Sequence, residues 1–201
     1  NLIQPAAVRP ERDYELWLEY GNEGDADLPA PLFVVSSPQN ALMRLATIES
    51  YAPGPVQVLG ISFDGLAGIL APGSKHRIPI YFRVPNANEL QFNVERMVAD
   101  ATAIDWNALE AQLRPSGIDP QAWAVIWINL KSQLGATWAD YLHALTDHAN
   151  YAALYGSRLY SVRELLALAM GRASGALAAR STLALSVDAF SPARVLPLAF
   201  M

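Results

Sequence analysis

Three side chains that could bind a metal ion lie within one short segment in the second half of the chain. Asp140, His143 and Asp147 follow the spacing i, i+3, i+7, which brings them to one face of a helix, with His148 beside them. The spacing differs from the His-Glu-x-x-His pattern of zinc hydrolases, and no second cluster completes a ligand set. We therefore favour a solvated helix face with local Asp–His pairs, and keep a small metal-dependent enzyme as an alternative.

A second group of carboxylates lies in an expected turn near residue 25. Glu23, Asp25 and Asp27 occupy alternate positions and offer the oxygen ligands that Ca²⁺ prefers. The longer calcium-loop pattern with its distal glutamate is missing, so an acidic hairpin turn is the favoured interpretation. We predict no structural metal and no cofactor.

Hydrolytic catalysis needs a nucleophile beside a base, and the sequence offers no such pair. His76 lies in an alternating strand next to a Gly-Ser turn, and there is no Gly-x-Ser-x-Gly elbow. The chain contains no cysteine, which removes disulfides, thiolate metal sites and a cysteine nucleophile. We expect no catalytic residues and no enzymatic activity.

The composition narrows the class of protein. Of 201 residues, 52% are hydrophobic and 16% charged, enough for a sizeable core. A net charge of −5 argues against binding to nucleic acid, which needs a basic stripe. No apolar run approaches the roughly 20 residues of a membrane-spanning helix. No signal peptide is evident, so we expect an excised piece of a longer protein whose targeting signal lies elsewhere.

Residues 1–100 show the two-residue period of strands, punctuated by Pro and Gly. In residues 13–20, Tyr14, Leu16, Leu18 and Tyr20 share one face, and Glu15, Trp17 and Glu19 share the other. Residues 76–84 alternate in the same way, and residues 31–37 and 55–63 are typical of short buried strands. Short strands separated by Gly and Pro turns predict an antiparallel β-sandwich.

Residues 101–175 change to the helical period. Asp105, Asp119, Thr137 and Ser161 each stand where an N-cap is expected, and Pro120 follows Asp119 at the first helical position. These signals predict a bundle of three to four helices, so the fold class is α+β. The bundle should bury four tryptophans in a shared core: Trp106, Trp123, Trp127 and Trp138.

Residues 176–201 return to strand-like sequence, at residues 181–187 and 195–200. This tail either pairs back onto the sandwich or begins the next domain. No flexible linker separates residues 90–103 from the first helix, so we expect the sandwich and the bundle to form one cooperative unit.

Two motifs of the first half resemble bacterial cell-adhesion-related Ig-like domains of the CARDB type. Val8-x-Pro10 and Tyr14 lead into Tyr20-Gly-Asn-Glu-Gly24, and Leu70-Ala-Pro-Gly-Ser74 opens a late strand. The resemblance covers about half the chain and implies an Ig-like sandwich, to which the helical region is an addition. Residues 185–200 are similar to the entry of YD-repeat (Rhs-type) shells, which implies a very large secreted or surface-displayed bacterial protein.

We expect, on this basis, a non-catalytic structural or adhesion-type module, secreted or at the bacterial surface. Its partners would be neighbouring domains of the same polypeptide, or a protein or glycan at the cell surface. A carbohydrate-binding module is the first alternative, with Trp17, Tyr20 and Tyr81 as the candidate ligand-binding residues. Trp17 lies between two glutamates on its strand face, so that it is either covered by a docked helix, as we expect if the two parts form one unit, or exposed for a partner.

Overall fold

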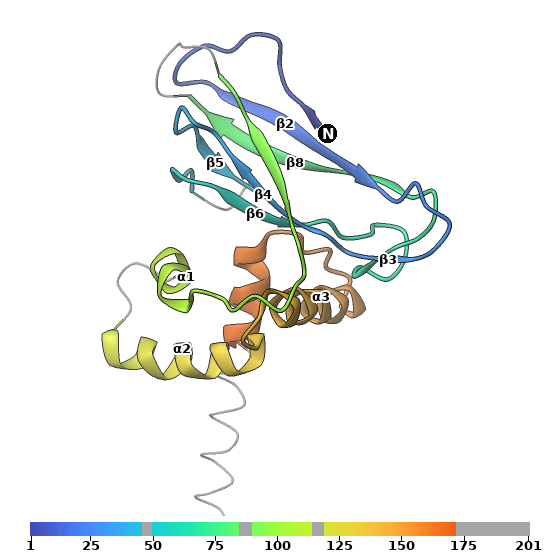
Figure 1. Ribbon diagram of the computed structural model, residues 1–201. Helices are drawn as coiled ribbons and strands as arrows, with labels where there is room; N and C mark the ends of the chain where they lie inside the picture. The colour runs from blue at the N-terminus through green and yellow to red at the C-terminus, as the bar shows by residue number, and fades with distance from the viewer. Residues whose placement is uncertain (46–49, 85–89, 114–118, 172–201) are drawn as a thin grey trace, which may run out of the picture.

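The computed structural model describes residues 1–45, 50–84, 90–113 and 119–171. It is a mixed α+β structure in which antiparallel sheets form one end of the molecule and helices the other (Figure 1). Within these ranges no helix combines the length and apolar character needed to cross a bilayer. The strand-like residues 181–187 and 195–200 lie outside the described residues.

The largest sheet has four strands in the order β1-β2-β8-β5, with β2 (Asp13–Gly21) and β8 (Lys75–Arg83) paired over nine residues. The short strands β1 (Leu2–Ile3) and β5 (Leu42–Arg44) flank this pair. The predicted alternation is confirmed, because the inward side chains are buried: Leu16, Leu18, Met43, Ile78, Ile80 and Phe82.

A second sheet faces the first across this core. In it, β4 (Leu32–Ser36) pairs with β6 (Val56–Leu59) on one side and β9 (Asn93–Met97) on the other. Val35 and Val58 pack into the same apolar cluster as the inward residues of the first sheet. A two-stranded ribbon, β3 (Leu28–Pro29) with β7 (Ile69–Leu70), lies at one end.

The helices begin at the predicted caps. They are α1 (Trp106–Leu113), α2 (Pro120–Leu134) and α3 (Trp138–Leu154), and residues 162–171 are also helical. The Asp119 side chain accepts a hydrogen bond from the amide of Ala122. Thr137 forms a capping box with Asp140 at the start of α3, and Gly156, with φ +78°, follows the end of that helix.

The four tryptophans of the helical part gather in one apolar cluster, as predicted. Trp123 and Trp127 are buried and stacked, with their ring centroids 5.6 Å apart. Trp106 meets Trp127 edge-on, and Trp138 packs at the margin. The cluster extends to the sheet of β4 and β6 through Leu32, Leu59 and Ile61. The apolar cluster between the two sheets is distinct from it, and Phe63 and Tyr160 pack against both clusters.

Hydrogen bonds also tie the helical part to the edge of β6. The backbone amide of Leu59 donates to the carbonyl of Tyr160 at 2.8 Å, and a β-bridge joins Val58 to Ser161. Arg158 Nη1 donates to the carbonyls of Ser62, at 3.1 Å, and of Gly65, at 2.7 Å. The segment before residue 162 therefore closes this sheet edge.

The prediction that a helix covers Trp17 is wrong. The described helices pack against the layer that contains β4 and β6 and against the ribbon near β3, whereas Trp17 lies on β2 in the other layer (Figure 1). Alternation shows that a strand has two distinct faces, but it cannot say which layer a distant helix will meet.

Candidate functional site

The face of the four-stranded sheet that points away from the core, called here the outer sheet face, carries two of the three predicted ligand-binding aromatics. Trp17 stands opposite Pro79 on β8 and Ile3 on β1, and Tyr81 stands opposite Glu15. Trp17 and Tyr81 are therefore diagonal neighbours on one face. Both are half-buried, so part of each ring is open to a partner.

Arginines and tyrosines alternate at one side of this face. The Arg44 guanidinium lies 4.4 Å from the ring centre of Tyr51 and 5.6 Å from that of Tyr81. Arg83 lies 4.9 Å from the Tyr51 ring, so that this ring contacts two guanidinium groups. Desolvation raises the pKa of Tyr51, and the nearby positive charge of Arg44 opposes the increase.

Ion pairs mark the two ends of the outer sheet face. Arg83 Nη2 lies 2.7 Å from Asp13 Oδ1, and Arg77 Nη2 lies 2.6 Å from Glu19 Oε1. The hydrogen bond to Asp13 raises the pKa of Arg83. In both pairs the acidic residue comes from β2 and the basic residue from β8. The negative charges of the two pairs therefore lie on one strand and the positive charges on the other.

Tyr20, the third predicted aromatic, does not join this surface. It points into the molecule, where its hydroxyl donates to the carbonyl of Ile61 at 2.6 Å and its ring packs near Phe33 and His76. Burial, with a smaller contribution from Tyr160, raises the pKa of Tyr20. The three aromatics therefore do not form one platform.

The acidic loop is organised by Asn22, which is buried. Its Nδ2 donates to the carbonyls of Ala26 and Leu70, and its Oδ1 accepts from the amide of Gly24. The carboxylate residues themselves, Glu23, Asp25 and Asp27, are exposed. Among the described residues, no three His, Asp or Glu side chains come close enough to hold a metal ion.

The three candidate metal ligands on α3 do not act together: Asp140 caps the helix, whereas His143 pairs with Asp147. Asp140 Oδ2 accepts hydrogen bonds from the amides of Ala136 and Thr137 and from the Thr137 hydroxyl. These bonds, led by the one from Ala136, lower the pKa of Asp140. His143 Nε2 instead lies 3.6 Å from Asp147 Oδ2, and both side chains are largely exposed.

His76 lies on the inner face of β8, near one end of the sheet. Its Nδ1 is 3.8 Å from Asp64 Oδ2, and its buried Nε2 has no hydrogen-bond partner among the described residues. Phe63 and Tyr20 pack against its ring. A hollow at this end of the sheet is lined partly by Phe63 and Asp64.

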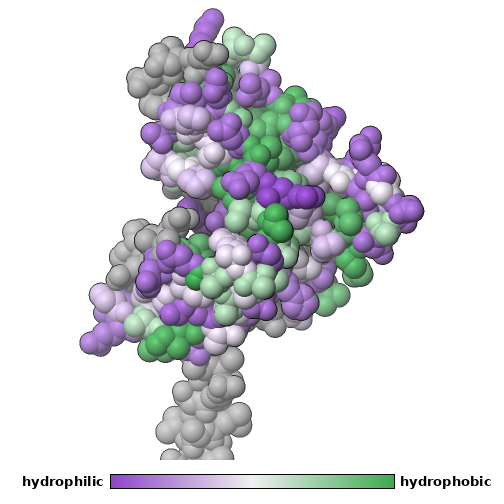
Figure 2. Space-filling view, viewed as in Figure 1, coloured by the Kyte–Doolittle hydropathy of each residue, from purple (hydrophilic) through white to green (hydrophobic). Residues whose placement is uncertain are grey.

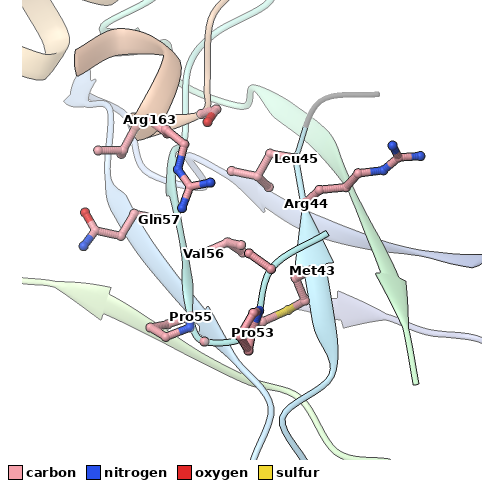
Figure 3. Close-up of a pocket in the computed structure, with 12 residues that line it drawn as sticks. Met43, Arg44, Leu45, Pro53, Pro55, Val56, Gln57 and Arg163 are labelled. Carbon is pink, nitrogen blue, oxygen red and sulfur yellow. The ribbon is translucent and has the colours of Figure 1, made fainter. Parts of the chain in front are cut away.

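A pocket of about 270 Å³ lies where the two parts of the molecule meet, between β5, the loop before β6 and the start of the helical residues 162–171 (Figure 3). Met43 and Val56 form part of its apolar lining. In Figure 3 Arg163 extends toward Val56 and Gln57, whereas Arg44 extends away from the pocket, consistent with its place over Tyr51.

The helical part also exposes apolar surface. Val125 and Ile128 of α2 are 53% and 64% exposed, and Figure 2 shows an apolar area over this helix. The outer sheet face differs because its aromatics are accompanied by charged groups of both signs. Among the described residues, this face thus combines partly exposed aromatic rings with charged groups of both signs.

Comparison of this chain with models of protein families, with curated proteins and with solved structures finds no match.

Proposed function

We propose that this chain is a non-catalytic structural and interaction module, an Ig-like β-sandwich extended by a helical lobe, within a larger secreted or surface-displayed bacterial protein. The strand order supports an Ig-like arrangement. The four-stranded sheet places the first two strands beside a late one, β8, with β5 at its edge, as strands A, B, E and D do in Ig domains.

The two motifs that resemble CARDB-type domains are in direct contact, which further supports the proposal. The Asn22 amide donates to the Ser74 carbonyl at 3.0 Å, and the Gly73 amide donates to the Asn22 carbonyl at 2.7 Å. Gly21 is needed here because a Cβ would overlap the Ser74 carbonyl oxygen. The residues of the resemblance thus build one turn pair at the end of the sheet.

One observation carries the structural role, namely that the helices pack directly on the sheet that contains β4 and β6. Leu32, Leu59 and Ile61 pack with Trp123 and Tyr141, and the backbone bond from Leu59 to Tyr160 joins the two parts. Apolar packing combined with a backbone hydrogen bond between the two parts supports a rigid unit over two hinged domains. A rigid unit can separate or support neighbouring domains of one polypeptide.

Single-molecule force spectroscopy tests this role. The chain is placed between marker domains and pulled from its two ends. A structural unit of this kind unfolds in one event that releases the length of both parts together. Detachment of the helices at low force, followed by a separate unfolding of the sheets, contradicts the proposal.

Carbohydrate binding remains the second candidate, because Trp17 and Tyr81 share the outer sheet face. A glycan array probed with the wild-type chain tests it. A signal that is lost in both Trp17→Ala and Tyr81→Ala, and retained in Tyr155→Ala on the helical part, would support this candidate. Equal signals from all variants, or none from the wild type, would reject it.

A further inference from the structure

The charges of the outer sheet face are segregated by strand. β2 contributes three carboxylates to it, and the neighbouring strands β8 and β5 contribute only cations, as the register shows: Asp13, Glu15 and Glu19 on β2; Lys75, Arg77 and Arg83 on β8; Arg44 on β5. An acidic strip therefore runs beside a basic strip along the whole sheet.

This pattern is complementary to itself. A two-fold axis that runs parallel to the strands, between β2 and β8, lays the acidic strip of one copy over the basic strip of another. The same operation is isologous, since each copy contributes the same patch. In the alternative orientation, β2 of one copy lies over β2 of the other. Like charges then face each other, so this orientation is disfavoured.

The centre of the face has the composition of an interface core. Trp17, Pro79 and Ile3 form one apolar row between the two ion pairs, and Tyr81 and Tyr51 adjoin it beside Arg44. Tryptophan, tyrosine and arginine are the residue types that contribute most to binding at protein interfaces. Charged groups surround this centre as a polar rim does.

We infer that the outer sheet face binds a second copy of this chain, face to face, to form a symmetric dimer. The two nine-residue strands β2 and β8 span about 30 Å in length and about 10 Å in width, and the short strands β1 and β5 add to the width only locally, so the face covers on the order of 400 Å² in projection. This area lies below the roughly 800 Å² per partner of standard interfaces. The dimer is therefore weak, dependent on concentration and weakened by salt.

The segregated charges favour a second copy over a glycan. A neutral sugar could stack on Trp17 or Tyr81, but its recognition would not require acids on one strand and bases on the next. A second copy uses both strips at once. This inference goes beyond the structural role, because a monomeric module could perform that role equally well.

Charge reversal on separate strands provides the test, with sedimentation equilibrium of the full chain over a range of concentrations. One variant combines Glu15→Lys with Glu19→Lys, and the other combines Arg77→Glu with Arg83→Glu. Each leaves the face with charge mostly of one sign, because only Asp13 stays negative in the first variant and only Lys75 and Arg44 stay positive in the second. Each variant should therefore associate with itself at least about tenfold more weakly than the wild type. Mixed in equal amounts, the two variants should form a heterodimer.

Two further variants keep the test decisive. A chain with all four reversals regains self-complementarity and should dimerise, which separates lost recognition from a damaged fold. Glu95→Lys with Arg96→Glu on the exposed strand β9 alters charge elsewhere and should leave the dimer intact. A wild type that stays monomeric at the highest concentration, self-association unchanged in both single-strand variants, or glycan binding by a chain that never dimerises would overturn the inference.

Discussion

At the scale of single residues, Asp140 shows how a side chain suited to metal binding is used for structure. Its Oδ2 accepts two amide hydrogen bonds and one hydroxyl hydrogen bond at the start of α3. These donors stabilise the carboxylate over the carboxylic acid, so the pKa of Asp140 is lowered. The ionised carboxylate stabilises the N-terminus of α3, the helix that carries the buried residues Tyr141 and Leu145.

This arrangement makes the stability of the protein dependent on pH. Because the pKa is lower in the folded state, Asp140 contributes stability above its ordinary pKa, and this contribution is lost as the pH falls through the lowered value. Asp140→Asn should therefore destabilise the protein at neutral pH, by an amount that shrinks in acid. Thr137→Val should cost about 1 kcal/mol at neutral pH through loss of the cap. Urea unfolding measured across pH checks both.

Asp147→Asn is the matched control on the same helix. Asp147 is exposed and its ion pair is with the equally exposed His143, so its substitution should change stability little between neutral and acidic pH. If Asp140→Asn showed the same flat profile as this control, the capping role would be contradicted.

The sequence predicted some residue roles better than others. Alternation in residues 13–20 predicts that Tyr20 lies on the face opposite Trp17, and the structure confirms this. The two aromatics therefore cannot belong to one ligand-binding surface. The sequence does not point to Tyr51, because its position over Arg44 and Arg83 depends on a bridge between Met43 and Ala52 that no local pattern reveals.

At the scale of elements, the docking of α3 depends on close approach to the loop before β7. The Gly68 amide donates to Asn150 Oδ1 at 2.8 Å. A Cβ at Gly68 would overlap the Cγ2 of Thr146 and lie 2.9 Å from Asn150 Nδ2. Glycine is required here by space, and the helix can reach the loop only because no side chain intervenes.

Gly68→Ala should consequently destabilise the protein by about 1–3 kcal/mol, because the added methyl group separates α3 from the loop or displaces the Thr146 side chain. Denaturant unfolding measures the loss. Adding Thr146→Ser removes the methyl group that the new Cβ would strike, and should restore part of the stability in the double variant.

Gly65→Ala, three residues earlier in the same loop, is the control. The nearest atom to a Cβ there is Ser62 Oγ at 3.8 Å, so the substitution should be neutral or slightly stabilising. Equal losses from both alanines would mean that loop flexibility, and not contact with α3, explains the effect of Gly68→Ala.

Local sequence predicted the helices better than the short strands. N-caps are local, and Asp119 with Pro120 was enough to place the start of α2. By contrast, β9 is largely exposed and is a strand because it pairs with β4, some sixty positions earlier in the chain. The strands β3 and β7 also depend on pairing between distant segments, because two residues are too few to give a periodic signal in the sequence.

At the scale of the whole molecule, apolar packing and backbone hydrogen bonds join the helices to one of the two facing sheets. The core that joins them contains Leu59 and Ile61 from the strand region and Trp123 and Leu145 from the helices. The sequence predicted one cooperative unit from the lack of a linker, but placed the helical cover on Trp17. Both layers carry apolar residues, and only tertiary packing decides which of them the helices contact.

Hydrogen exchange during urea unfolding, followed by mass spectrometry of peptides, measures whether the molecule behaves as one unit. Peptides from β8 report on the sheets, and peptides from α3 report on the helical part. In a single cooperative unit, the slowest-exchanging amides of both parts become exposed only through global unfolding. Their protection should therefore fall together, at the same urea concentration.

Coincident loss of protection is expected in the two sets of peptides, with a shift of both by the same amount in Gly68→Ala, because α3 packs on the sheet of β4 and β6, which faces β8 across the other apolar cluster. Loss of protection in α3 at a lower urea concentration, while β8 remains fully protected, would contradict a single cooperative unit.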